Sequence, residues 1–230
     1  FLWDFHLGIM MDKWRDQYGS QVKDWIHAIS RMEELLSFAV LARTREVSYP
    51  EVTRHEKVEV SAENLRHPLI NPSKVVPNDA AFKGGATIIT GSNMSGKTTF
   101  LRTLGINLIL AYAGAPVCAE KMHADYMKIF TSMRVTDDVS NGISTFYAEI
   151  LRIKSMVEYK KNEMPMLCLI DEIFKGTNSA DRIVGATQVI RKLSDDHSMT
   201  LVSTHDFELC ELKSESGAPA ANYHFEEYYE

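Results

Sequence analysis

The stretch that decides the fold is Thr87–Phe100, TIITGSNMSGKTTF. It begins with a short apolar and β-branched run and ends in residues that can continue as a helix. Between them the pattern G-x-x-x-x-G-K-[ST] runs from Gly91 to Thr98. The two glycines let the backbone curl so that successive N–H groups point into one concavity, which suits phosphate oxygens. A Gly-rich turn with a chance Lys-Thr is the alternative, but the complete pattern in a strand–loop–helix context favours a phosphate-binding loop.

The residue types in this loop suit a nucleoside triphosphate with Mg²⁺. Lys97 is expected to bring a positive charge to the β- and γ-phosphates, and the Thr98 hydroxyl to ligate the metal ion. The following helix adds its positive N-terminal end to the same site. The residues that we expect to contact the nucleotide are Gly91, Ser92, Asn93, Met94, Ser95, Gly96, Lys97, Thr98 and Thr99.

Composition sets limits on the class of protein and on its partners. The chain has 230 residues and a net charge of −6, so no overall basic field attracts nucleic acid, and DNA is neither supported nor excluded. The three cysteines lack metal-ligand spacing and favour a reducing compartment, which we expect to be the cytoplasm. No apolar run approaches the roughly 18 residues that span a bilayer. A first residue Phe1 and an aromatic-acidic ending indicate a fragment of a longer protein.

Two regions are expected, a helical segment over residues 1–48 and a larger domain over 49–230. In the first region apolar residues recur at three- and four-residue spacing, the pattern of one helix face. Gly19-Ser20 is a plausible break between two helices. The members of this face are Val22, Trp25, Ile26, Ile29, Met32, Leu36, Ala39 and Val40. The aromatic stripe of the earlier helix, Trp3, Phe5, Trp14 and Tyr18, is interpreted as packing against a neighbouring helix rather than as a membrane or nucleic-acid surface.

From residue 87 onward, strand and helix patterns alternate, which is typical of an α/β fold with a parallel sheet and crossover helices. We predict strands at 87–90, 126–133, 166–170 and 199–203, and helices at 97–112, 144–161, 179–195 and 206–212. The later strands are nearly all apolar, as expected when helices or other layers cover both faces of the sheet.

Two of these strands end in residues that suit catalysis. The run Met166–Ile170 is followed by Asp171 and Glu172, which we expect to hold Mg²⁺ and to orient or deprotonate the attacking water. Many strands end in a charged turn, so this acidic pair predicts a catalytic role only in combination with the phosphate loop. The strand at 199–203 is followed by His205, which we expect to contact the γ-phosphate, although an ordinary surface histidine is the alternative.

Several motifs in a fixed order resemble the ATPase domain of the MutS mismatch-repair family. They are the phosphate loop with its Asn-Met interior, Ser144-Thr-Phe-Tyr-Ala-Glu149, Asp171-Glu-Ile-Phe-Lys-Gly-Thr177, Ser203-Thr-His205, Arg66-His-Pro68 and Asn222-Tyr-His224. The resemblance covers about residues 64–226, while residues 1–60 resemble only the last helices of the family's lever region. It implies a P-loop NTPase of the ABC class that binds ATP with Mg²⁺ and hydrolyses ATP.

The resemblance also implies roles that the residues alone do not. Two such domains would pair head-to-tail as a homodimer, with Ser144 of one domain contacting the γ-phosphate held by the other. Asn93 would help both the nucleotide and the partner contacts, and His224 with Val75 or Val76 would border the adenine. The implied function is a nucleotide-driven switch on DNA, with the DNA held mainly by regions outside this chain and with no membrane contact.

The sequence departs from the family pattern at several points. The loop interior is Ser-Asn-Met-Ser rather than a version containing Pro and Gly, and Phe174-Lys175 replace the usual small and basic residues. No mismatch-reading or clamp domain and no C-terminal dimerisation helices are recognised, so we expect impaired dimerisation of this chain. Other roles for an ABC-class ATPase, such as recombination control, stay open. A transporter nucleotide-binding domain would need a Leu-Ser-Gly-Gly-Gln signature, where this chain has Ser-Thr-Phe. A nucleotide-dependent scaffold without hydrolysis is the third alternative.

Overall fold

The computed structural model describes residues 2–92, 94–133, 145–162, 164–213 and 220–226. The chain divides into two compact units, Phe1–Thr44 and Arg45–Glu230. The first unit is helical, and the second is a mixed α/β unit that contains a parallel sheet with helices. Among the described residues, no helix combines the length and the apolar character needed to cross a membrane.

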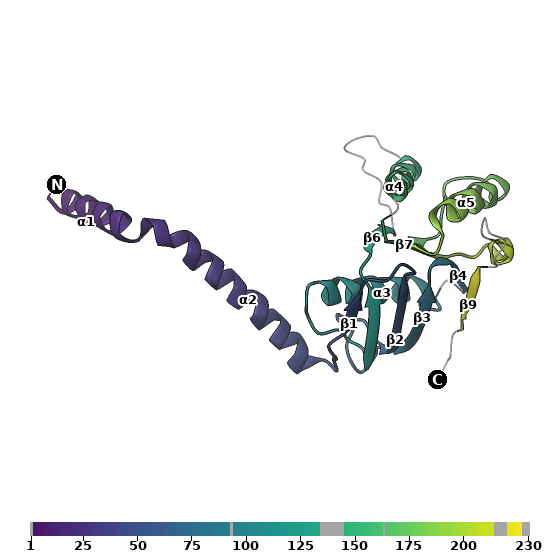
Figure 1. Ribbon diagram of the computed structural model, residues 1–230, viewed down its shortest axis with the longest axis horizontal. Helices are drawn as coiled ribbons and strands as arrows, with labels where there is room; N and C mark the ends of the chain where they lie inside the picture. Colours follow the sequence, from purple (N-terminus) through teal and green to yellow (C-terminus); the bar gives the residue numbers. More distant parts are fainter. Residues whose placement is uncertain (1, 93, 134–144, 163, 214–219, 227–230) are drawn as a thin grey trace. The chain divides into compact units, whose positions relative to one another are not determined.

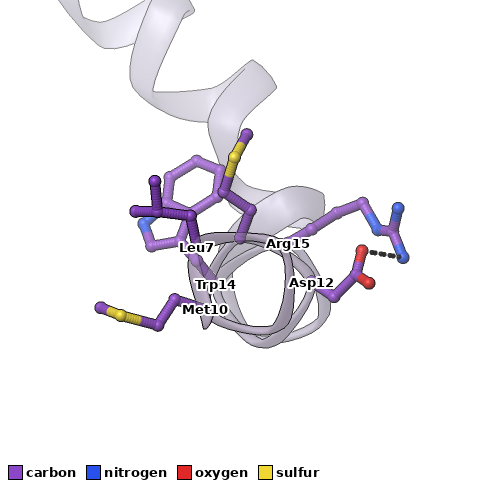
Figure 2. A pocket seen from close by; sticks show the side chains of 6 residues that line it. Leu7, Met10, Asp12, Trp14 and Arg15 are labelled. Atoms are coloured by element: carbon purple, nitrogen blue, oxygen red, sulfur yellow. Dashed lines mark ion pairs between the residues drawn. The ribbon is translucent and has the colours of Figure 1, made fainter. Parts of the chain in front are cut away.

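The first unit consists of α1 (Leu2–Tyr18), a single 3₁₀ turn η1 (Gly19–Gln21) and α2 (Val22–Thr44). These elements confirm the predicted helices and the predicted break at Gly19-Ser20. Throughout the described residues of α1 and α2, no side chain is buried. Figure 2 shows Leu7, Met10 and Trp14 on one side of α1, and the Asp12–Arg15 ion pair of 3.0 Å on the other. The rings of Trp14 and Tyr18 lie 6.5 and 6.0 Å from that of Trp25 in α2, whereas packing of Trp3 and Phe5 against a neighbouring helix stays a prediction.

The second unit is built on a sheet in which every described strand pairing is parallel. Its strands in spatial order are β6 (Lys128–Ser132), β7 (Met166–Asp171), β8 (Ser198–Ser203), β4 (Gly85–Gly91) and β9 (Ala221–Phe225). Residues along β7 alternate between two cores, since Leu167 and Leu169 face one and Cys168 and Ile170 the other. Both faces of this sheet are therefore covered, as its apolar strands predict.

A smaller sheet of the same unit has a different character. Its strands in spatial order are β1 (Glu51–Thr53), β5 (Lys121–Asp125), β2 (Glu59–Leu65) and β3 (Asn78–Lys83). The pairing of β1 with β5 is parallel, whereas β2 pairs antiparallel with both β5 and β3. Along β2 and β3 buried and exposed residues alternate, so one face of the sheet contacts the core and the other faces solvent.

Helices cover both faces of the parallel sheet (Figure 1). On one face α3 (Lys97–Tyr112) packs into a core that also includes the buried side chains of the small sheet. On the other face α4 (Thr145–Lys160) and α5 (Ser179–Leu193) enclose the second core. The Asn178 side chain caps α5 by accepting a hydrogen bond of 3.0 Å from the backbone N–H of Asp181.

Two of the predicted elements differ in the structure. The helix predicted at 206–212 is a 3₁₀ helix, η2 (Phe207–Glu211), in which only Leu209 is buried, so one apolar contact anchors a single short turn. The strand predicted at 126–133 begins at Lys128. Tyr126 directly follows β5, and its N–H donates to the Thr53 carbonyl oxygen of the small sheet, so it is not part of the parallel sheet. Strands β5 and β9 were not predicted. Their short lengths and mixed polar and apolar residues give a weak pattern.

Candidate active site

The loop between β4 and α3 has the backbone geometry that its glycines allow. Gly91 has φ 140° and Gly96 has φ 92°, both in the region that side chains with a Cβ avoid. Gly91 also has no room for a side chain, because a Cβ there would lie 2.4 Å from the carbonyl oxygen of Phe225. Lys97 is buried within this curl, and its Nζ donates to the carbonyl oxygens of Gly91, at 2.7 Å, and of Ser92. The ammonium group is therefore held inside the loop by backbone oxygens.

The end of β7 brings a carboxylate to the first turn of α3. The Thr98 hydroxyl lies 2.9 Å from both carboxylate oxygens of Asp171, although 73 residues separate them. The Ser203 hydroxyl also donates to Asp171, since parallel register pairs Asp171 of β7 with Ser203 of β8. These three oxygen-bearing side chains meet at the carboxyl ends of the strands, where open α/β sheets bind their ligands.

The second acidic residue lies at the centre of a charged group. Glu172 Oε1 is 3.1 Å from His205 Nε2, and Glu172 Oε2 is 2.6 Å from Lys175 Nζ. The Glu172 backbone has φ 56°, a left-handed conformation uncommon for a residue with a side chain. Its N–H donates to the Ser203 carbonyl at 3.0 Å, which fixes this turn against β8. Strain of this kind occurs often at functional sites, where surrounding contacts hold it in place.

The loop after the acidic pair is held by a buried carboxylate from α4. Phe174 also has a left-handed backbone, with φ 58°, and its N–H donates to Glu149 Oε1 at 2.6 Å. Burial raises the pKa of Glu149, while this hydrogen bond and the charges of Lys175 and Arg152 oppose the rise. The Phe174 ring packs against Phe146, with centroids 6.2 Å apart. Glu149 therefore supports the backbone that carries Glu172.

A cavity of about 880 Å³ opens beside the phosphate loop. His67 lies in its wall, and burial together with the charge of Arg102 lowers the pKa of its imidazole. His224 is not among the residues that line this cavity, and its Nδ1 instead lies 3.0 Å from Thr90 Oγ1. The predicted nucleotide contacts that line it are Val75, Val76, Met94, Ser95, Gly96 and Thr99.

The structure thus brings most of the predicted site residues to one edge of the parallel sheet. Asn93 and Ser144 lie outside the described residues. Ser203, Glu149 and Lys175 had no predicted role in the site. All three stand inside the quoted motifs, and the position of Ser203 at the end of a strand beside β7 was a usable signal. The contact of Glu149 depends on a packing between α4 and the 172–177 loop that no sequence pattern indicates.

Comparison with known proteins shows the family to which this chain belongs. Residues 87–228 match the family described as MutS domain V. The chain belongs to the MutS family. It is 32% identical over 220 residues to the DNA mismatch repair protein MutS of Staphylococcus haemolyticus, an alignment covering 92% of this chain and 24% of that protein. It is 37% identical over 149 residues to the protein of the same name from Thermus aquaticus, covering 64% of this chain and 18% of that protein. This MutS-family chain therefore spans about a quarter or less of the length of these relatives.

Proposed function

We propose that this MutS-family chain binds ATP with Mg²⁺ and hydrolyses ATP. The observation that carries the proposal is the pairing of Thr98 with Asp171 at 2.9 Å, beside a loop whose curl holds Lys97. Phosphate groups would lie in this loop, where Lys97 can exchange its carbonyl partners for phosphate oxygens. The cavity along Val76, Ser95 and Thr99 would receive the rest of the nucleotide.

The donors beside Lys97 fit Mg²⁺. Thr98 Oγ1 and the Asp171 carboxylate offer only oxygen atoms, the ligands that this small, hard cation prefers, and the site would retain several waters. When bound, Mg²⁺ neutralises charge on the phosphates. The Ser203 hydroxyl also donates to Asp171 Oδ1 and so helps to fix the orientation of this carboxylate.

Glu172 is proposed as the group that acts on water. Its carboxylate would orient a water molecule and take up a proton as the water oxygen bonds to the γ-phosphorus and the bond to the bridging oxygen breaks. His205 lies close enough to Glu172 to orient it, and it can also contact the γ-phosphate. Lys175 pairs with the other oxygen of Glu172, and each carboxylate oxygen keeps a further lone pair that can accept a hydrogen bond from water.

For the role on DNA, we propose a nucleotide-dependent switch in DNA mismatch repair or a related DNA transaction. The relatives are named DNA mismatch repair protein MutS, and this supports the direction of the proposal. Two domains would pair head-to-tail as a homodimer around ATP, with Ser144 reaching the partner's nucleotide and Asn93 assisting. DNA would be held mainly by parts outside these 230 residues. His224 would border the adenine after releasing Thr90.

The test compares nucleotide binding with turnover in three variants. Lys97→Met should lose ATP binding, whereas Glu172→Gln should bind ATP and lose turnover by about 100-fold or more. Glu208→Gln is the matched control, because it removes an exposed carboxylate nearby on η2 and should leave both unchanged. Turnover at the wild-type rate in Glu172→Gln would contradict the catalytic role. Equal ATP affinity in Lys97→Met would contradict the nucleotide site.

The homodimer is tested by measuring specific turnover against protein concentration, with and without duplex or branched DNA. A rate that rises with concentration and is lost in Ser144→Ala supports pairing around the nucleotide. A rate that is independent of concentration and unchanged in Ser144→Ala contradicts it for this chain.

A further inference from the structure

A group of metal-ligating residues lies on the small sheet, separate from the proposed nucleotide site. His123 and Asp125 are two residues apart on β5, so both side chains point to the same face of the sheet. In the parallel register Thr53 of β1 pairs with Asp125, and His55 follows two residues later. Two sequence segments about 70 residues apart thus bring two imidazoles and one carboxylate to the same edge of this face.

The distances suit coordination of one ion. One potential ligand atom from each of His55, His123 and Asp125 lies within 4.8 Å of the other two, and His55 Nδ1 lies 2.9 Å from Asp125 Oδ1. Zinc bonds of about 2.0–2.1 Å in a tetrahedral arrangement place ligand atoms about 3.3 Å apart. Rotation of the two imidazoles, whose side chains are 57% and 24% exposed, can close the remaining difference.

The surroundings of these residues also resemble a metal site. Asp125 is buried, and the backbone N–H groups of His55 and Glu59 donate to its two oxygens at 3.1 and 2.9 Å, which fixes the carboxylate. Glu59 Oε1 lies 3.7 Å from His123 Nε2 and can supply a fourth ligand. A purely structural role explains Asp125, which organises the turn after β1, but it does not explain why two imidazoles and this carboxylate bring ligand atoms within 4.8 Å of one another.

We propose that His55, His123 and Asp125 bind a divalent transition-metal cation of the Zn²⁺ class, with Glu59 or water completing the coordination. Two imidazoles and one carboxylate favour Zn²⁺, Co²⁺ or Ni²⁺ over Mg²⁺, which prefers oxygen ligands. The bound ion would join the end of β1 to β5 and so stabilise the small sheet. The proposal does not depend on nucleotide binding.

The direct experiment titrates the metal-free chain with Co²⁺ and Zn²⁺ in the absence of nucleotide. One equivalent of Co²⁺ should give visible d–d absorption, and Zn²⁺ should displace it. Zn²⁺ at about 100 times its dissociation constant should raise the melting temperature by about 5–10 °C, and a chelator should reverse the rise. No d–d absorption and no thermal shift in the wild-type chain would overturn the proposal.

Variants assign the binding to these residues. His55→Gln and His123→Gln should each lose the Co²⁺ absorption, whereas the matched control His197→Gln, an exposed histidine after α5, should retain it. His123→Cys should bind Co²⁺ with an added thiolate-to-metal charge-transfer band, a positive signal that a misfolded variant would not give. Wild-type Co²⁺ spectra in both glutamine variants, or no charge-transfer band in folded His123→Cys, would show that the ion binds elsewhere.

Discussion

Replacing Glu149 should release the loop that carries the proposed catalytic Glu172. Glu149 is 6% exposed, and its Oε1 accepts the Phe174 N–H at 2.6 Å. In Glu149→Ala this N–H loses a charged acceptor in a region with little access to water, which costs about 1.5–3 kcal/mol. For a chain of this size the melting temperature should fall by about 3–12 °C. ATP turnover should fall with it, because Phe174 is held in a left-handed conformation two residues after Glu172.

Glu149→Gln is the matched comparison, because its amide oxygen keeps the acceptor and removes the charge. Burial raises the pKa of Glu149 above the unfolded value of about 4.3, so the folded chain holds this proton more tightly. The resulting stability is present below the unfolded pKa and is lost as the pH rises through the folded pKa. At neutral pH the glutamine variant should therefore stay within about 1 kcal/mol of wild type. The stability of wild type relative to this variant should decrease as the pH rises from 4 to neutrality.

The assay is urea-induced unfolding of the three proteins at several pH values, combined with ATP turnover under the same conditions. The expected order of stability at neutral pH places Glu149→Ala well below the other two. If Glu149→Ala unfolds at the same urea concentration as Glu149→Gln, the hydrogen bond to Phe174 does not hold this loop. If its stability falls but turnover does not, the loop does not position Glu172.

Three further changes test other parts of the second unit. Gly91→Ala should lower the free energy of unfolding by at least about 2 kcal/mol, because its Cβ would lie 2.4 Å from the Phe225 carbonyl oxygen and the backbone has a φ of 140°. A variant as stable as wild type would contradict this geometry. Asn178→Ala should lose about 1 kcal/mol with its helix cap, whereas Asn178→Ser should recover most of it. Hydrogen bonds from Arg182 lower the pKa of Asp206, so this pair stabilises the fold above the unfolded pKa of about 3.9. That contribution, about 1 kcal/mol, should vanish as the pH falls through the lowered pKa, and acid unfolding of Asp206→Asn should lack it.

The sequence was sufficient for features whose cause is local. The backbone turns at Gly91 and Gly96, in the loop between β4 and α3, could be predicted because glycine adopts a positive φ without steric cost. Helix α3 begins at Lys97 and ends at Tyr112, as predicted from the residues that follow this loop. The apolar runs at 166–170 and 199–203 indicated strands covered on both faces, and β7 and β8 show this burial.

Weaker or shorter sequence patterns did not predict the secondary structure correctly. Strand β5 has only five residues, too few for a clear alternation of polar and apolar side chains. It pairs with β1 and β2, which lie far from it in the sequence. The segment predicted as a helix at 206–212 contains too few buried positions to specify more than the 3₁₀ turn η2. In both cases the local signal was smaller than the contribution of tertiary contacts.

The sequence by itself determined the backbone turns at Gly91 and Gly96, the acidic pair at the end of β7 and the alternation of strands and helices, because these follow from bonded geometry and periodicity. Only the tertiary structure decided which distant side chains meet. Thr98 reaches Asp171, Glu172 reaches His205, and His55 joins Asp125. Such contacts depend on the order and register of strands within a sheet. That order is fixed by how the whole chain buries its apolar residues, and no segment carries this information alone.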